Sequence, residues 1–157
     1  MLHHAVYEGA QWFYDRVSQI EYDLIGISYY PHWHGKSIIE LRHAIQLLTK
    51  YDKGIVMAET SYPFTLDWDD FTTNIIGLED QLILPEYPAT PEGQKSFVEE
   101  MRTIMQEADL GTGLCYWGGE WVAWKGDQAT DGSPWENQAV FDFNNKALPV
   151  LRVFETR

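Results

Sequence analysis

Residues 54–63 read Gly-Ile-Val-Met-Ala-Glu-Thr-Ser-Tyr-Pro, and this stretch decides the fold that the sequence predicts. A short apolar run begins at a glycine and ends in one carboxylate, that of Glu59, with aromatic and turn residues directly after it. Parallel barrel strands deliver side chains of this kind to their carboxyl ends, where the active sites of such barrels lie. The stretch therefore predicts a parallel barrel strand with Glu59 at its mouth.

Three further apolar segments have strand length, and helical patterns lie between and after the four strands. The other expected strands are residues 1–4, 23–29 and 113–117. The expected helices are residues 10–20, 37–51, 90–108 and 148–154. The second helix opens with a capping box formed by Ser37 and Glu40. This alternation of strand and helix predicts an α/β fold, a parallel sheet covered by helices.

Four such units fit either an open doubly wound sheet or half of an eight-stranded barrel, since a full barrel needs about 250 residues. Doubly wound sheets usually carry a glycine-rich phosphate turn, and no expected strand is followed by one. The strands end instead in His, Tyr, Glu and Trp, and long segments follow the third and fourth strands at 62–89 and 118–145. We therefore expect residues 1–157 to be a single partial domain, half of a TIM-barrel catalytic domain.

The composition excludes several classes of partner. The formal net charge is −13, from 24 acidic against 11 basic residues, which disfavours nucleic acid and anionic membranes because both require basic patches. No apolar run has the length of a membrane span, and the first residues do not resemble a signal peptide. Cys115 is alone, which rules out an intrachain disulfide and a cysteine zinc site. Aromatic residues make up 15% of the chain, and those in loops can stack on sugar faces.

The motifs resemble those of one known family. Residues 23–35 read Asp-Leu-Ile-Gly-Ile-Ser-Tyr-Tyr-Pro-His-Trp-His-Gly and resemble the sixth-strand signature of glycoside hydrolase family 53, the arabinogalactan endo-β-1,4-galactanases. Residues 56–63 resemble the seventh strand of the family, residues 90–94 the start of its seventh helix and residues 113–117 its eighth strand. The resemblance covers essentially the whole chain, in order and with matching spacing.

The resemblance implies a (β/α)8 barrel of which this chain supplies the C-terminal half, strands 5–8. It also implies retaining hydrolysis by double displacement, with Glu59 as the nucleophile that forms a covalent glycosyl-enzyme. A nucleophilic carboxylate needs a hydrogen-bond donor that holds it. The alternation of side chains can place either Tyr29 or Tyr30 at the mouth, and we expect Tyr30 to orient Glu59. The expected substrate-binding residues are Trp117, which would floor the reacting subsite, and Trp33, His34, Trp121 and His3.

No cofactor is expected, and the sequence raises two metal interpretations. The histidines at positions 3, 4, 32 and 34 lack the fixed spacing of a zinc set with an acid partner, so we expect them to be hydrogen-bonded or exposed. The resemblance implies that a calcium ion can bind the loop after the seventh strand, where Asp67 and Asp69 would be the candidate ligands. That loop lacks the glycines of a tight calcium loop, and we expect a solvated acidic loop there.

The chain departs from the family pattern in two places. After the eighth strand the family commonly has Trp-Glu-Pro-Ala-Trp, whereas residues 117–121 read Trp-Gly-Gly-Glu-Trp. Residues 1–4 resemble the fifth strand, so strands one to four are not in this chain, and with them the acid/base glutamate of strand four. Glu79, Glu86 and Glu120 lie in loops and do not follow an asparagine at a strand end. Because general acid catalysis supplies about 10²–10⁴-fold, we expect the isolated half to be severely impaired.

The predicted function is that of a retaining endo-β-1,4-galactanase fragment acting on galactan or arabinogalactan, the side chains of plant pectin. Three alternatives stay open: another retaining barrel glycosidase, such as a mannanase or cellulase, a non-catalytic galactan-binding half-barrel, and an inert fragment that folds by association and neither binds nor cleaves galactan. The expected partners are β-1,4-galactan and either the missing N-terminal half-barrel or a second copy, because a half-barrel exposes two sheet edges. By family we expect a secreted, periplasmic or cell-surface location.

Overall fold

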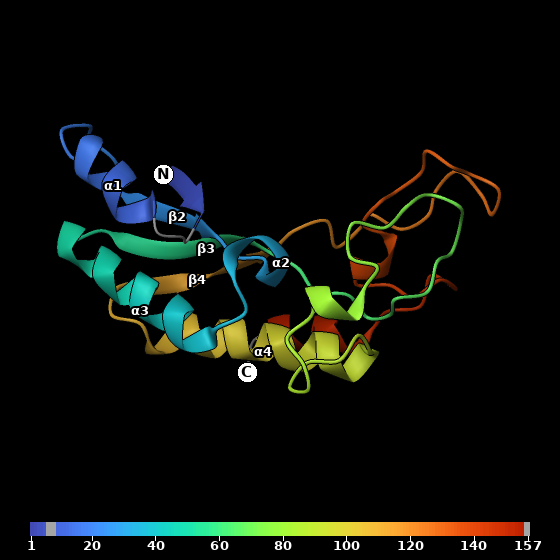
Figure 1. Cartoon of the computed structure of the whole chain (residues 1–157). Coiled ribbons are helices and arrows are strands. Elements are labelled where there is room, and N and C mark those ends of the chain that lie inside the picture. Colours follow the sequence, from blue (N-terminus) through green and yellow to red (C-terminus); the bar gives the residue numbers. More distant parts are fainter. Residues whose placement is uncertain (6–8, 156–157) are drawn as a thin grey trace. The chain divides into compact units, whose positions relative to one another are not determined.

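The computed structural model describes residues 1–5 and 9–155, which form two compact units (Figure 1). The first unit contains Met1–Thr60 and Glu100–Tyr116. The second contains Ser61–Glu99 and the described residues from Trp117 onward.

The first unit is built on a four-stranded parallel sheet in the order β1-β2-β3-β4. Its strands are β1 (Leu2–Ala5), β2 (Leu24–Ser28), β3 (Gly54–Thr60) and β4 (Gly111–Tyr116). The order in space follows the order in the chain, and each pair of neighbouring strands is joined by a helical crossover, as parallel pairing requires. The predicted α/β fold with a parallel sheet is confirmed.

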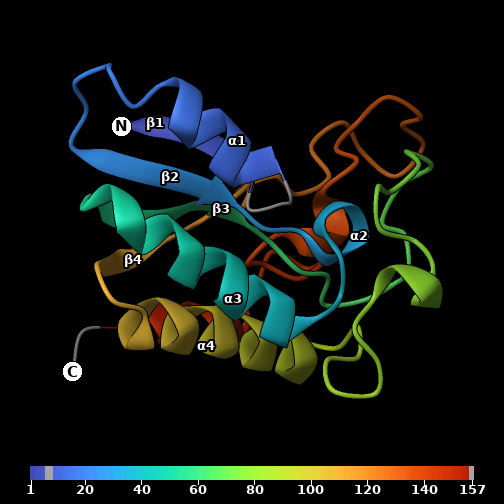
Figure 2. The ribbon, with the colours of Figure 1, turned by 60° about the vertical axis from the view of Figure 1, so that its left-hand side comes forward.

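Helices cover one face of this sheet (Figure 2). They are α1 (Gly9–Arg16), α3 (Ile38–Leu48), continued by the 3₁₀ turn η1 (Thr49–Tyr51), and the C-terminal part of α4 (Pro91–Glu107). The Ser37 hydroxyl caps α3 by accepting the Glu40 N–H, which confirms one half of the predicted capping box. Arg42 of α3 forms ion pairs with Glu100 and Glu107 of α4. No helix in the described ranges is long and apolar enough to cross a bilayer.

Three helical expectations need correction. Helix α1 ends at Arg16 instead of residue 20; beyond it the chain forms a turn in which the Ile20 N–H donates to the Val17 carbonyl and the Ser18 hydroxyl to the Asp15 carbonyl. A short helix, α2 (Pro31–His34), follows β2 directly and was not predicted; Pro31 at its first position suits a helix start. The expected C-terminal helix is the 3₁₀ helix η4 (Pro149–Phe154), a form typical of short pieces.

A β-bulge in β3 decides which side chains share a face with Glu59. Gly26 pairs with both His3 and Val56, so the side chains of His3 and Val56 lie on the same face, and Met57 points to the opposite one. The pairing then shifts: Ile27 is opposite Met57, but Ser28 is opposite Glu59. The extra residue returns Glu59 to the face of His3.

Strict alternation of side chains would place Ile55 and Met57 on the face of Glu59, whereas the bulge leaves them on the opposite face. Both residues are fully buried, whereas Val56 and Ala58 are partly exposed. Buried apolar side chains on β2, α3 and α4 complete the core of the first unit: Ile25, Ile27, Leu41, Ile45, Leu48, Met101, Ile104 and Met105. The bulge thus lets one strand supply both core side chains and the carboxylate.

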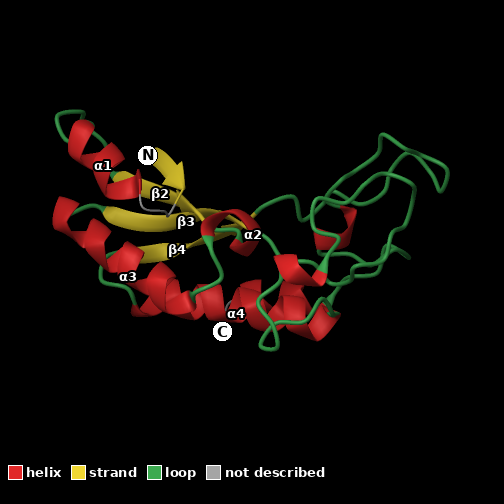
Figure 3. Cartoon of the chain, in the orientation of Figure 1, coloured by secondary structure: helices red, strands yellow, loops and turns green. Residues whose placement is uncertain are grey.

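The second unit is mostly loop (Figure 3) and is held by its own buried contacts. It contains η2 (Glu79–Gln81), η3 (Glu136–Gln138), η4 and the start of α4. The rings of Tyr62 and Phe97 stack at 4.2 Å between centroids. The buried Gln94 amide donates to the carbonyls of Tyr62 (3.0 Å) and Ala139 (2.9 Å), which ties the segment after β3 to the segment after β4.

Candidate active site

The site in the first unit begins with Glu59 at the carboxyl end of β3. Its side chain is 26% exposed, so the carboxylate is accessible but not fully solvated. The Tyr30 hydroxyl, at the carboxyl end of β2, donates to Glu59 Oε2 at 3.0 Å. Burial, followed by the nearby charge of Glu59, raises the pKa of Tyr30. Tyr30 therefore keeps its proton and remains a donor to the carboxylate.

It is Tyr30, not Tyr29, whose hydroxyl reaches Glu59. The Tyr29 hydroxyl instead donates to the Gly35 carbonyl at 2.8 Å, and its ring is buried. The Tyr29 N–H donates to the Glu59 carbonyl at 2.9 Å, which fixes the end of β2 beside the end of β3. Successive tyrosines thus serve different purposes because they point to opposite faces of the sheet.

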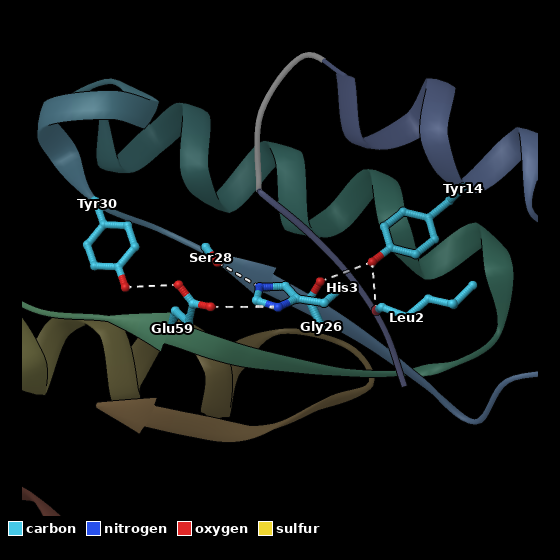
Figure 4. A network of polar contacts seen from close by, with 7 residues as sticks. All are labelled: Leu2, His3, Tyr14, Gly26, Ser28, Tyr30 and Glu59. Carbon is cyan, nitrogen blue, oxygen red and sulfur yellow. Dashed lines mark hydrogen bonds and ion pairs between the residues drawn. The ribbon is translucent and has the colours of Figure 1, made fainter. Parts of the chain in front are cut away.

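His3 of β1 faces the second oxygen of Glu59 (Figure 4). His3 Nδ1 lies 3.8 Å from Glu59 Oε1, which is too long for a hydrogen bond but within range of electrostatic attraction. The other ring nitrogen, Nε2, lies 2.6 Å from the hydroxyl oxygen of Ser28. The two nitrogens of the His3 ring are therefore directed to different partners, Nε2 to Ser28 and Nδ1 to Glu59.

Helix α2 places two of the predicted substrate-binding residues beside Tyr30. His34 Nδ1 accepts a hydrogen bond from the Tyr30 N–H at 3.0 Å, and burial lowers the pKa of His34, which favours its neutral form. The Trp33 ring meets the Tyr30 ring edge to face at 5.2 Å and is 47% exposed. Trp33 thus braces Tyr30 and still presents apolar surface to solvent.

The remaining two predicted aromatic residues belong to the second unit. The rings of Trp117 and Trp121 meet edge to face at 5.6 Å, and Trp121 in turn meets Trp135 at 6.1 Å. Trp117 and Trp121 are both more than one third exposed. The Ser133 hydroxyl donates to the Trp121 carbonyl at 2.7 Å and fixes this segment. Rings fixed in this way offer apolar faces of the kind on which sugars stack.

The acidic loop of the second unit is organised around Glu136. This glutamate is 1% exposed and accepts the Asp69 N–H at 2.8 Å through Oε1. Burial, then the nearby charge of Asp70, raises the pKa of Glu136. Burial also raises the pKa of Asp69, with help from the charges of Asp127 and Asp70.

The candidate calcium ligands in this loop do not form a convergent donor set. Asp67 is exposed, and its N–H donates to the Thr65 hydroxyl. Within residues 1–5 and 9–155, no three Asp, Glu, His or Cys side chains come together in a way that could hold a metal ion. The expectation that no calcium ion is required stays a prediction, and no step of the chemistry is routed through a metal ion.

The structure thus gathers Glu59, Tyr30 and His3 in direct contact, with Trp33 and His34 beside Tyr30. Ser28 is the residue that the prediction of site residues missed. Ser28 is the last residue of β2 and stands two residues before Tyr30, and this spacing, which favours side chains on the same side, was a signal present in the sequence. Its contact with His3 joins residues 25 positions apart and depends on the register of β1 against β2.

Chemically, the arrangement presents a carboxylate whose two oxygens face two different groups. A tyrosine hydroxyl holds one oxygen, and a histidine nitrogen faces the other. A carboxylate fixed in this way can act as a nucleophile or as a general base. Neither contacting group is a carboxyl, so a second acid for a two-carboxylate mechanism does not come from these contacts.

A family model and two curated relatives indicate one family. The model of glycosyl hydrolase family 53 matches residues 1–154. The arabinogalactan endo-β-1,4-galactanase of Cellvibrio japonicus is 36% identical over 162 residues, covering 99% of this chain and 42% of that protein. The endo-β-1,4-galactanase of Bacillus subtilis is 28% identical over 171 residues, covering 88% of this chain and 39% of that protein.

Solved structures show the same likeness. The family 53 catalytic domain of Ignisphaera aggregans superposes with a TM-score of 0.85 at 38% identity, covering 98% of this chain and 45% of that chain. A fungal β-1,4-galactanase superposes with a TM-score of 0.71 at 25% identity, covering 98% of this chain and 46% of that chain. The four-stranded sheet is therefore part of a TIM barrel. The chain spans about two fifths of the length of these curated relatives.

Proposed function

Because the chain belongs to glycosyl hydrolase family 53, a family of glycosidases, we propose that it is the nucleophile-bearing part of a retaining endo-β-1,4-galactanase. The observation that carries the proposal is the contact of Tyr30 Oη with Glu59 Oε2 at 3.0 Å, at the carboxyl ends of neighbouring strands. Active sites of barrels lie at this end of the sheet. The names of the relatives support β-1,4-galactan and arabinogalactan as the substrate class.

In the proposed mechanism, Glu59 attacks the anomeric carbon of a galactosyl unit. A bond forms between a carboxylate oxygen and that carbon while the glycosidic bond breaks, and the leaving oxygen takes a proton from an acid. Water then gives a proton to the conjugate base of that acid and attacks the same carbon, which releases the sugar with retained configuration and restores the Glu59 carboxylate. Tyr30 holds the carboxylate in position for both steps, and exposed rings such as Trp33 offer apolar faces to neighbouring sugar units.

The acid requires a second carboxyl about 5–5.5 Å from the nucleophile. We propose that it comes from the N-terminal half of the barrel, supplied by the remainder of a longer chain or by an associated one. Without it, cleavage of natural galactan is expected to be about 10²–10⁴-fold slower. A substrate with a weakly basic leaving group needs no such proton, so it isolates the contribution of Glu59.

The first test therefore uses 2,4-dinitrophenyl 2-deoxy-2-fluoro-β-galactobioside, whose leaving group departs as a stable phenolate. The fluorine slows breakdown of the glycosyl-enzyme, so intact-protein mass spectrometry detects one added galactobiosyl group. Peptide mapping should place this group on Glu59. The matched variant Glu59→Gln keeps the size of the side chain but removes the nucleophile, and labelling should fall by roughly 10³-fold or more.

Parallel assays on potato galactan, mannan and cellulose separate the proposed substrate from those of other barrel glycosidases. Labelling of Glu59 with slow or absent turnover of galactan is the expected pattern for a chain without its acid. A label on a different carboxyl group, or equal labelling of the wild type and Glu59→Gln, would contradict the proposal. Galactan binding that is unchanged in Glu59→Gln, with no label in either protein, would point to a non-catalytic binding half-barrel.

A further inference from the structure

The His3–Ser28 contact is shorter than the contacts that Glu59 makes with Tyr30 and His3. His3 Nε2 lies 2.6 Å from Ser28 Oγ, and Ser28 is 8% exposed. The opposite nitrogen, Nδ1, lies 3.8 Å from Glu59 Oε1. Figure 4 shows both contacts of the His3 ring, one to Ser28 and one to Glu59.

The chemistry of the three groups fixes the direction of the protons. An ionised carboxylate can only accept hydrogen bonds, whereas a serine hydroxyl can donate or accept. A neutral imidazole carries one N–H and one lone pair. If the lone pair of Nδ1 faced Glu59, two negative regions would lie 3.8 Å apart. The favourable arrangement has the proton on Nδ1, and Nε2 must then accept the hydrogen of the Ser28 hydroxyl.

We propose that Ser28 is a positioning residue for the Glu59 nucleophile: its hydroxyl donates to His3 Nε2 and so holds His3 in the tautomer whose Nδ1–H faces Glu59. The proposal rests on the proposed function, in which Glu59 is the nucleophile. In this arrangement both carboxylate oxygens face donors, Tyr30 at Oε2 and His3 at Oε1. A donor pre-directed in this way stabilises the charged nucleophile without any reorganisation when the substrate binds.

The backbone around the pair is built to hold this geometry. His3 is in register with Gly26 of β2, and a Cβ atom at position 26 would come within 2.8 Å of Met1 Sδ and 3.3 Å of His3 Cβ. The missing side chain leaves room for the His3 ring to lie along β2 and reach Ser28. The buried Tyr14 hydroxyl of α1 lies 3.0 Å from the carbonyl oxygens of both Leu2 and Gly26 and ties β1 to β2.

Tyr14 provides a matched control for Ser28. Both residues support the junction of β1 and β2 through a hydroxyl, but only the hydroxyl of Ser28 touches His3. Tyr14→Phe should therefore lower stability and leave the tautomer of His3 unchanged. Ser28→Ala should change the tautomer, and Ser28→Thr, which restores a hydroxyl, should recover it.

The deciding measurement is nitrogen-15 NMR of the whole chain with labelled histidine, at a pH at which the shifts show His3 to be neutral. Protonated and unprotonated ring nitrogens differ widely in shift, so the spectrum reports the tautomer directly. The spectrum of His3→Gln identifies the His3 signals among the five histidines. We expect Nδ1–H in the wild type and Tyr14→Phe, a mixture of tautomers in Ser28→Ala, and Nδ1–H again in Ser28→Thr.

A second readout links the tautomer to Glu59. The rate of labelling by the fluorinated galactobioside should fall about tenfold in Ser28→Ala, as expected for loss of one oriented donor, and stay near the wild-type rate in Ser28→Thr and Tyr14→Phe. A proton on Nε2 in the wild type would overturn the proposal without any variant. Equal labelling of Ser28→Ala and the wild type would overturn it as well. If the wild type shows Nδ1–H but no label on Glu59, the proposed function fails while the assignment of the hydrogen bond stands.

Discussion

At the scale of single residues, Tyr30 illustrates how one hydroxyl can fix the position of a carboxylate through a hydrogen bond. Its hydroxyl donates to Glu59 Oε2 at 3.0 Å, and the residue is 7% exposed. Burial and the charge of Glu59 both raise the pKa of Tyr30, so it does not ionise over the usual working range of pH. The sequence could not decide between Tyr29 and Tyr30, because the choice depends on where the sheet ends and α2 begins.

We predict that Tyr30→Phe slows labelling of Glu59 by about ten- to hundredfold, since hydrogen bonds to charged groups are worth about 1.5–3 kcal/mol. Tyr29→Phe is the control. It removes a hydroxyl that contacts the Gly35 carbonyl, and it should leave labelling nearly unchanged while lowering stability. Rates from intact-protein mass spectrometry check both. Equal rates for Tyr30→Phe and the wild type would show that the 3.0 Å contact does not support the nucleophile.

At the scale of elements, the bulge in β3 allows one strand to bury apolar side chains in the core and to direct Glu59 to the other face. The strand must bury Ile55 and Met57 in the core and still direct Glu59 to the face that carries His3 and Ser28. In a regular strand, Met57 and Glu59 would share a face. The shifted pairing between Met57 and Thr60 removes this conflict by inserting one extra residue.

The bulge predicts different losses of stability for substitutions at positions 56 and 57. Met57→Ala should cost about 2–5 kcal/mol of unfolding free energy, because it leaves a cavity in the core. Val56→Ala, on the partly exposed face, should cost about 1 kcal/mol or less. Urea unfolding followed by circular dichroism measures both. A larger loss at position 56 than at position 57 would mean that β3 faces the other way.

At the scale of the whole molecule, the sheet of the first unit has two open edges. In the described part of the chain, β1 pairs with β2 and β4 pairs with β3, and the outer sides of β1 and β4 carry no strand. Open edges of a parallel sheet present unpaired backbone groups that favour pairing with another chain. The net charge of −13 opposes association between copies, most strongly at low salt.

We therefore predict that the chain self-associates at micromolar concentration in moderate salt, unless the N-terminal half of a barrel occupies the edges. Sedimentation velocity under reducing conditions, which exclude a disulfide through the exposed Cys115, should show a species larger than a monomer. Cys115→Lys places a charge on the edge strand β4 and should weaken association, whereas Cys115→Ser should not. A single monomeric species with a sharp thermal transition would contradict the prediction.

The order of the four strands and of the crossover helices α1, α3 and α4, the parallel sheet, the family and the position of Glu59 at a strand end follow from the sequence alone, whereas the short helix α2 does not. These features depend on local patterns and short motifs: apolar runs of strand length, a capping serine, and residues 54–63 with their single acid. These patterns predict secondary structure because each depends on residues that are close in the chain. They can therefore be recognised without knowing where a strand lies in the sheet.

Only the tertiary structure decided which side chains meet. The bulge that returns Glu59 to the face of His3 arises from pairing with β2, and the His3–Ser28 contact depends on the register of β1. The physical reason is that register and bulges are set by packing between strands far apart in sequence, and a shift of one residue exchanges the two faces of a strand. The sequence identified residues 1–4 and 23–30 as strands with polar side chains. Only the pairing of these strands in the sheet places those side chains beside the Glu59 carboxylate.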